Sequence, residues 1–545
     1  MKGHLGSFVV ELFARAGSHS LSRVLQAIGL AAAIAVSNIP PCAAAPAAAP
    51  VVDTSSGRLR GIQTERGVLA YLGVRYGESP AGAGRFLPAT LAHRQAGIVP
   101  ADASGKELVQ TVGNAQPADL TKQSEDALLL NVWTARLTGK RPVMVWIHGG
   151  GNWQGSGSES DGTSLVANND VVVVSINYRL GIFGFMDVSL LGGEKYRTSA
   201  SSGILDQRLA LQWVQRNIAH FGGDPHKVTV FGCSAGGVDI AALLATEAPS
   251  HLFRRAILES GFANTAKSLA VARRFSRAVF EEGQIRTMAE LLAKPPGELI
   301  DIQNRVLAKL TEGERDLAYQ PTVDGRVITD FPMAMIERGA AKDIDVLLGT
   351  TLNEVRFYHY YNPEFGTKTL GETIGLSGLP APLLQQMDTV YRRSRPDAQT
   401  WQVNLDVASD YWFRIPAIRL AEAQLKHNPN VYLYLFNWPK ADPAYGVPHG
   451  SEISFVFGEK LDPEDYDLKA PGAVDVAKRL STTMQRYWTS FARDGHPSAQ
   501  GAPSWPPYDP RQRPTMELAS QPRVVPDPHG EERRLFDTVE FRGRQ

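Results

Sequence analysis

Residues 228–237 read Val-Thr-Val-Phe-Gly-Cys-Ser-Ala-Gly-Gly, a stretch that predicts a strand, a tight turn and the start of a helix. Val228–Phe231 has the β-branched, apolar character of a buried strand, and Ala235–Ala245 returns to a helical pattern. Between them the sequence fits G-x-S-x-G, with glycine on both sides of a sharp strand-to-helix turn that lifts a serine hydroxyl above the sheet edge. An incidental glycine-rich turn is the alternative. The strand–turn–helix setting favours Ser234 as a catalytic nucleophile.

A second glycine-rich turn lies upstream, where His148-Gly149-Gly150-Gly151 follows the apolar run Val143–Ile147. Three glycines let the backbone pass close to a reacting carbonyl and point amides toward it. We therefore predict an oxyanion hole made by the amides of Gly150, Gly151 and Ala235. The alternative is a flexible glycine turn without a catalytic role.

The rest of the chain alternates between short apolar runs and helical patterns, which predicts an α/β fold with a mostly parallel central sheet flanked by helices. Helix-rich stretches at 266–340 and 355–430 read as excursions from that sheet that form the substrate cleft. We expect one catalytic domain over residues 46–545. The further strands are predicted at Val171–Ile176, Val346–Leu348 and Val431–Phe436, and the further helices at Leu205–Phe221 and Val474–Arg493.

Composition excludes several classes of protein. The 545 residues are 43% hydrophobic and 21% charged, which is too apolar for a disordered chain. Lys and Arg number 56, as do Asp and Glu, so nothing predicts a nucleic-acid or membrane-surface partner. The two cysteines, Cys42 and Cys233, exclude a disulfide scaffold and a thiolate metal cluster. No H-E-x-x-H, dinucleotide or phosphate-loop motif is present, so we predict no metal and no cofactor.

The N-terminus has the pattern of a secretory signal peptide. Basic residues precede the apolar run Val24–Val36, and a small-residue stretch, 42–45, follows. We predict that residues 1–45 are a signal peptide cleaved near 44–49, which leaves no integral span in the mature chain. An N-terminal anchor helix is the first alternative, but the apolar run is short for a span. A lipid anchor on Cys42 is the second, and the prolines before it disfavour that reading.

A serine nucleophile needs a base, and the base needs a carboxylate to hold its tautomer. The order Ser, then Asp or Glu, then His is typical of this elbow. Glu354 follows the strand that ends near Gly349, and His449 lies in a loop with glycine and proline after Val431–Phe436. Spacing alone does not choose among the many downstream carboxylates. Two other histidines compete for the role of base, His496 and His529.

Many short motifs along the chain occur together in one order. They are Tyr71-Leu72-Gly73-Val74, Arg85-Phe86, residues 124–133 (SEDALLLNVW), the glycine loop at 148–151, Asn177-Tyr178-Arg179, Phe221-Gly222-Gly223-Asp224-Pro225, the serine elbow, residues 252–257 (LFRRAI), His449-Gly450-Ser451-Glu452 and Trp505-Pro506. Taken together, the chain resembles the type-B carboxylesterase/lipase family, which also contains the cholinesterases and the non-catalytic neuroligins.

The resemblance implies an α/β-hydrolase fold and a catalytic triad of Ser234, Glu354 and His449. It implies a serine hydrolase that cleaves small to medium carboxylic esters through an acyl-enzyme. With the leader, it favours an exported, bacterial-type member that is periplasmic or secreted. A neuroligin-like binding protein without activity is one alternative, and the same triad acting on carbamates or amides is another. Nothing in the sequence assigns an oligomeric state.

The resemblance also implies supporting residues. Ser260 is expected to support Glu354. Two ion pairs, Arg85–Glu125 and Arg179–Asp206, are expected to serve folding rather than chemistry.

The chain departs from the family beside the nucleophile and beside the acid. Cys233 stands where the family usually has Glu, so Glu452 is expected to lack its usual carboxylate neighbour. Cys233 could itself be a nucleophile, but it precedes the apex of the elbow, and a buried small side chain is the favoured reading. Asn353 and Val355 replace the usual Asp and Gly around the acid.

Overall fold

The computed structural model describes residues 47–111, 116–310, 318–361, 363–374, 379–459 and 461–539. The predicted signal peptide, with Cys42, lies outside these residues. No described helix combines the length and the apolar character needed to cross a membrane.

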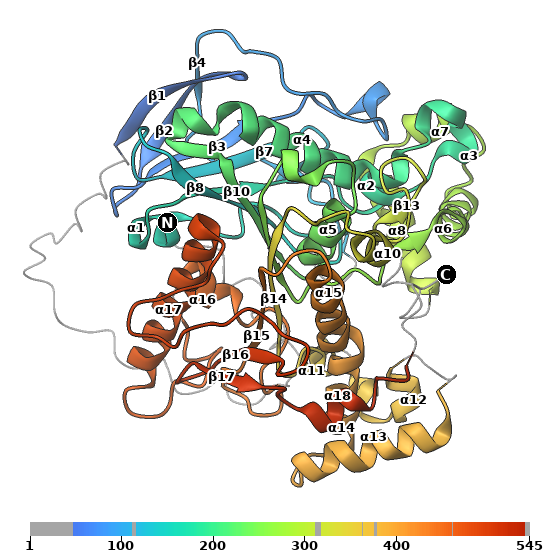
Figure 1. Ribbon diagram of the computed structural model, residues 1–545. Helices are drawn as coiled ribbons and strands as arrows, with labels where there is room; N and C mark the ends of the chain where they lie inside the picture. Colours follow the sequence, from blue (N-terminus) through green and yellow to red (C-terminus); the bar gives the residue numbers. More distant parts are fainter. Residues whose placement is uncertain are drawn as a thin grey trace, which may run out of the picture. The chain divides into compact units, whose positions relative to one another are not determined.

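A mixed sheet organises the described residues (Figure 1). Its centre is parallel, and each strand there is buried on both faces, which explains the continuous apolar runs. In spatial order the parallel strands are β9 (Val172–Ile176), β8 (Arg141–Ile147), β10 (Gly223–Cys233), β11 (Arg255–Glu259), β14 (Asp345–Thr351), β15 (Val431–Phe436) and β16 (Pro514–Leu518).

Both sides of this parallel centre continue in antiparallel strands, which the sequence analysis did not predict. On one side the order outward from β9 is β7 (Leu129–Thr134), β3 (Leu69–Arg75), β2 (Gly57–Gln63) and β1 (Ala48–Thr54), with the short β4 (Ile98–Pro100) parallel to β2. On the other side β17 (Arg523–Pro526) pairs antiparallel with β16. The prediction of a mostly parallel sheet flanked by helices is confirmed for the centre.

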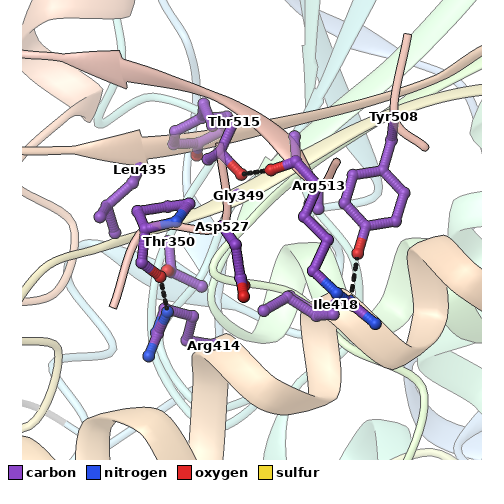
Figure 2. Close-up of a pocket in the computed structure, with 13 residues that line it drawn as sticks. Gly349, Thr350, Arg414, Ile418, Leu435, Tyr508, Arg513, Thr515 and Asp527 are labelled. Carbon is purple, nitrogen blue, oxygen red and sulfur yellow. Dashed lines mark hydrogen bonds between the residues drawn. The ribbon is translucent and has the colours of Figure 1, made fainter. Parts of the chain in front are cut away.

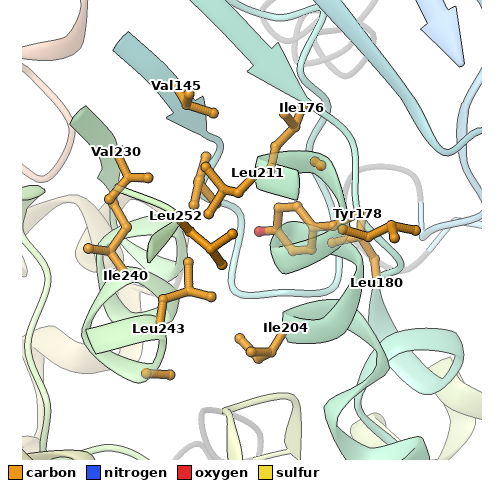
Figure 3. Packing of buried hydrophobic residues seen from close by; sticks show 14 of the residues in the cluster. Val145, Ile176, Tyr178, Leu180, Ile204, Leu211, Val230, Ile240, Leu243 and Leu252 are labelled. Carbon is orange, nitrogen blue, oxygen red and sulfur yellow. The ribbon is translucent and has the colours of Figure 1, made fainter. Parts of the chain in front are cut away.

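Side chains alternate along the central strands, so each strand contributes to two separate cores. In β8, Val143, Val145 and Ile147 belong to the core that also includes residues of α4 (Ser202–Asn217), α5 (Ala235–Leu244) and α15 (Ile415–Leu425). Within this core α5 lies against β8, and α15 lies against β14 and β15. Met144 and Trp146 point the other way, toward α1 (Thr163–Asn168), α16 (Ile453–Phe457) and α17 (Ala473–Asp494). Figure 3 shows the first core, where Val145 and Val230 lie near Leu211, Ile240 and Leu243.

The two helix-rich excursions are confirmed as insertions between strands. Between β11 and β14 lie α6 (Leu269–Glu282), α7 (Met288–Ala293), α8 (Pro296–Lys309) and α10 (Pro332–Glu337). Between β14 and β15 lie α11 (Arg356–Tyr361), α12 (Leu370–Thr373), α13 (Ala381–Ser394), α14 (Thr400–Ser409), the π-helical turn η8 (Asp410–Arg414) and α15. The second excursion builds its own apolar cluster with the C-terminal helix α18 (Gly530–Arg534) nearby (Figure 1).

Candidate active site

Ser234 lies at the junction between β10 and α5, at the carboxyl edge of the parallel strands. Its backbone has φ 59° and ψ −124°, a region that side chains other than glycine rarely adopt. Such a conformation costs about 1–3 kcal/mol and persists only where surrounding contacts hold it. Here the Ser234 amide donates to the Glu259 carbonyl at 2.9 Å, and its carbonyl accepts from Val238 N at 2.9 Å. The predicted elbow is therefore present, with a half-buried serine at its apex.

The two glycines of the elbow allow it to rest directly on the end of β8. A Cβ on Gly232 would lie 2.5 Å from the Ile147 carbonyl oxygen, and one on Gly236 would lie 2.0 Å from the same atom. Any side chain at either position would push the turn away from β8. The motif thus reflects a close approach of backbones as well as a tight turn.

The loop that follows β8 passes across the front of the elbow. A Cβ on Gly149 would lie 3.2 Å from Ser234 Cβ and 2.8 Å from the Cys233 carbonyl oxygen. Gly150 and Gly151 adopt φ values of 98° and 64°. Within the described part of the chain, the amides of these two glycines and of Ala235 donate to no protein acceptor. Among the described residues, the three amides predicted to hold an oxyanion therefore keep their hydrogen-bonding capacity unused, and Gly149 of the same loop lies against the elbow.

A buried polar network holds this loop, and the sequence analysis missed it. Asn152 Nδ2 donates to Asp239 Oδ1 at 2.9 Å, and Gln207 Nε2 donates to Asp239 Oδ2 at 2.5 Å. The Tyr178 hydroxyl oxygen lies 2.9 Å from the His148 carbonyl oxygen and 3.1 Å from Asn152 Oδ1, so the hydroxyl can donate to either. Burial raises the pKa of Asp239 to about 7. Because Asp239 belongs to α5, the network joins the glycine-rich loop at 148–151 to the helix that follows Ser234.

Glu354 and His449 are brought together from loops that follow β14 and β15. Glu354 Oε2 lies 2.5 Å from His449 Nδ1. The other oxygen, Oε1, accepts from Ser260 Oγ at 2.6 Å and from the Thr351 amide at 2.7 Å. The Glu354 side chain is fully buried and that of His449 is 14% exposed. The expected support of Glu354 by Ser260 is thus confirmed, and both carboxylate oxygens have partners.

This pairing decides the protonation behaviour of the imidazole. Burial alone lowers the pKa of His449, but the charge of Glu354, its hydrogen bond and the charge of Glu452 outweigh burial. The pKa therefore lies above its usual 6.5. The other two candidate bases lie elsewhere: His496 Nδ1 is 2.8 Å from the Tyr432 hydroxyl, and His529 is 3.4 Å from Glu532.

The thiol of Cys233, beside Ser234, is buried, as expected, and is unsuited to attack. Burial raises the pKa of Cys233 well above its ordinary value, and the charges of Glu452, Glu259 and Glu354 raise it further. The thiolate, which is the nucleophilic form, is therefore strongly disfavoured.

The environment of Glu452 differs from the expectation. The carboxylate missing at position 233 is replaced by another, Glu259, which is the strand partner of Cys233. Glu259 Oε1 accepts from Trp488 Nε1 at 2.8 Å, and Glu452 Oε1 accepts from the Tyr434 hydroxyl at 3.2 Å. The second oxygen of each is buried and has no hydrogen-bond partner among the residues that the structure describes. Burial raises the pKa of both carboxyls; the charge of Glu452 raises that of Glu259 further, and the charge of Glu354 raises that of Glu452 further. No sequence motif predicts this pair of carboxyls, because it is the pairing of β11 with β10 that brings Glu259 beside Cys233.

The remaining predicted contacts are present but lie outside this constellation. The ion pairs Arg85–Glu125, at 2.6 Å, and Arg179–Asp206, at 2.7 Å, are confirmed. The described residues contain no cluster of His, Cys, Asp and Glu suited to a metal ion.

A pocket lies between β14, β15, α15 and the C-terminal strands (Figure 2). None of the six predicted site residues lines it. Two guanidinium groups at its wall are already paired, Arg414 with Asp410 and Arg513 with Glu422.

A parallel sheet with a strained serine between strand and helix, and with the order Ser, Glu, His along the chain, defines an α/β-hydrolase. The chain belongs to the Carboxylesterase family, whose profile matches residues 48–535. It is an enzyme that hydrolyses carboxylic esters.

Individual relatives agree with this assignment. The chain is 36% identical to the para-nitrobenzyl esterase of Bacillus subtilis (strain 168) over 500 residues, which covers 89% of this chain and 98% of that protein. It is 33% identical to the acetylcholinesterase of Bungarus fasciatus, over 86% of this chain and 83% of that one. Among solved structures, a Geobacillus stearothermophilus carboxylesterase is similar with a TM-score of 0.79 and 34% identity, over 89% of this chain and 100% of that one.

Proposed function

We propose that the enzyme hydrolyses small to medium carboxylic esters through an acyl-enzyme on Ser234. In this proposal His449 is the base, Glu354 orients it, and the amides of Gly150, Gly151 and Ala235 hold the oxyanion. The observation that carries it is the buried Glu354–His449 pair at 2.5 Å, at the same sheet edge as the serine elbow.

The chemistry follows from the roles of these groups. Neutral His449 accepts the proton of the Ser234 hydroxyl while Oγ bonds to the ester carbonyl carbon. The negative charge that develops on the carbonyl oxygen is held by the three amides. Collapse of this intermediate breaks the bond to the alcohol, which leaves with the proton from His449. Water then attacks the acyl-enzyme by the same route and releases the acid.

The alternatives differ in what the site can do. A neuroligin-like binding protein is not favoured, because the relatives above carry names of esterases, and the contact between Glu354 and His449 supports a working base. Carbamates and amides would use the same groups. An amide substrate has a far more basic leaving group, which must be protonated before it departs. A carbamate forms a carbamoyl-enzyme that is hydrolysed more slowly than an acyl-enzyme.

The experiment is rapid-mix kinetics with p-nitrophenyl esters of increasing acyl length, beside the matched p-nitroanilide and carbamate. We expect an initial burst of nitrophenol that approaches one equivalent per enzyme, followed by slower steady turnover. Esters of short and medium acyl chains should turn over faster than the anilide. Absence of turnover of every ester by a folded enzyme would contradict the proposal.

The oxyanion loop offers a test that depends on its packing. In Gly149→Ala the new methyl meets the Cys233 carbonyl at 2.8 Å, so the loop must shift away from the elbow. Loss or displacement of an oxyanion donor costs about 10²–10³-fold in rate. We expect kcat for p-nitrophenyl acetate to fall about 100-fold while the protein stays folded.

The matched control is Gly297→Ala, in α8, where the nearest atom to a new Cβ is Leu120 Cδ1 at 3.8 Å. Its kcat should equal that of the wild type, with an unchanged or higher melting temperature because Ala favours helix. Equal kcat values for both variants would exclude the amides of this loop from the chemistry.

Export belongs to the same proposal. Residues 1–45 act as a signal peptide, residues 46–545 form the catalytic domain, and the enzyme works in the periplasm or outside the cell. The basic, apolar and small-residue pattern supports this. The Ala47 carbonyl accepts from Gln63 N at 2.7 Å, so cleavage before residue 47 keeps the first strand pairing complete. N-terminal sequencing of the exported protein checks the cleavage site, and an uncleaved, membrane-bound product would contradict it.

A further inference from the structure

Asn353, which precedes the acid in sequence, joins the acid loop to the histidine loop. Its amide donates to the Val447 carbonyl at 2.9 Å, and its side-chain Oδ1 accepts from the Val447 amide at 3.1 Å. The next residue pair continues the pattern, because the His449 amide donates to the Glu354 carbonyl at 3.2 Å. The backbones that carry acid and base are therefore fastened to each other beside the Glu354–His449 pair.

The other end of the Asn353 side chain is held by a buried carboxylate. Asn353 Nδ2 donates to Asp406 Oδ1 at 2.8 Å. Asp406, in α14, has a side chain that is 1% exposed and forms ion pairs with Arg356 and with Arg395, each at 2.7 Å. The two guanidinium groups hold the carboxylate in place. Asp406 is thus a fixed acceptor for the side chain at position 353.

This position needs a side chain with a donor at one end and an acceptor at the other. An amide supplies both, whereas a carboxylate supplies acceptors only. An Asp at 353 would place two buried carboxylates about 2.8 Å apart, where like charges repel strongly. Space is equally restricted: a Cβ on Gly446, whose φ is 58°, would lie 2.3 Å from Asn353 Oδ1.

We propose that Asn353 and Asp406 together act as the positioning device for the Glu354–His449 pair, and that the amide at 353 is required by the carboxylate at 406. The inference rests on the proposed triad. It explains why this chain carries Asn where its family usually carries Asp. It also makes a residue of α14, outside the active site, a determinant of how well His449 accepts a proton.

The test compares Asn353→Asp, Asp406→Asn and the double variant that exchanges the two side chains. In Asn353→Asp we expect kcat per active site to fall about 10–100-fold with KM within about twofold, because a misplaced catalytic group costs up to about 100-fold. The double variant again places one amide donor against one carboxylate. Its kcat should therefore be at least tenfold higher than that of Asn353→Asp if the single variant loses 100-fold. Asp406→Asn alone leaves two arginines without their carboxylate and should lose activity without that recovery.

Asn404→Asp is the matched control. Asn404 is also buried in α14, but its Nδ2 donates to the Lys368 carbonyl at 3.0 Å and not to either catalytic loop. This substitution should lower the melting temperature and leave kcat per active site unchanged.

A second readout does not depend on turnover. The proton between His449 and Glu354 should give a far-downfield proton NMR signal in the wild type, shift or broaden in Asn353→Asp, and return in the exchange variant. An unchanged signal and unchanged kcat in Asn353→Asp, or an exchange variant no better than the single ones, would overturn the inference. Failure of the proposed function appears separately, as a wild type that gives this signal but hydrolyses no ester.

Discussion

Replacement of Ser234 by Ala should lower kcat for p-nitrophenyl esters by about 10⁴–10⁶-fold, the scale seen when a serine nucleophile is removed. The elbow keeps its geometry, because the backbone bonds of residue 234 to Glu259 and Val238 do not involve the hydroxyl. Ala tolerates the same φ of 59° no worse than Ser does. The loss therefore reports chemistry and not folding, and steady-state assays at high enzyme concentration measure it.

Cys233→Ala is the control for this experiment, since it removes the neighbouring thiol and leaves the hydroxyl. The thiol is buried with a raised pKa, so we expect the variant to retain hydrolysis within about tenfold of the wild type. The reverse pattern, with Ser234→Ala active and Cys233→Ala inactive, would move the nucleophile to the thiol and contradict the account.

Replacement of Glu354 by Gln should lower kcat by about 10⁴-fold at neutral pH, because the base loses the carboxylate that holds its tautomer and stabilises its charged form. Gln keeps the size of the side chain and its contacts with Ser260 and the Thr351 amide remain possible. Ser260→Ala removes one donor to the carboxylate but leaves the charge, so its effect on kcat should be much smaller.

The pH profile of kcat/KM tests independently whether Glu354 raises the pKa of His449. His449 must be neutral to accept a proton, and its pKa is raised in the folded enzyme chiefly by Glu354, against burial. Activity of the wild type should therefore be lost as pH falls through a value above 6.5. Without the Glu354 charge that pKa drops, so the acid limb of Glu354→Gln should move to lower pH. An acid limb that stays in place or moves up would assign the controlling charge to another group.

Much of the fold was predictable because buried parallel strands are short, apolar and uninterrupted. The runs at Val143–Ile147 and Val431–Phe436 are found as β8 and β15 nearly to the residue. The antiparallel strands at the sheet edges were not predicted. Their burial alternates, as in β2, where Gly57–Gln63 mixes buried and exposed positions, so no continuous apolar run marks them.

The residues of the candidate site likewise fall into those that a local motif predicts and those that only tertiary packing brings together. Residues within one local motif, such as Ser234 and the glycines of the oxyanion loop, could be identified from the sequence, since a tight turn imposes its own pattern. Asn152 and Asp239 are 87 positions apart, and Asn353 and Asp406 are 53 apart. Only the packing of α5 and α14 brings such pairs together, and single polar residues in helices carry no signature of a partner. The same holds for Glu259, whose role depends on the register of β11 with β10.

Acylation of Ser234 is tested most directly by treating the purified enzyme with a fluorophosphonate, followed by digestion and mass spectrometry of the modified peptide. We expect one phosphonyl group per enzyme on Ser234 and no label in Ser234→Ala. The labelling rate should decrease as the pH is lowered, because His449 becomes protonated. A label on Cys233 or elsewhere, or none on a folded enzyme that still hydrolyses esters, would contradict acylation of Ser234.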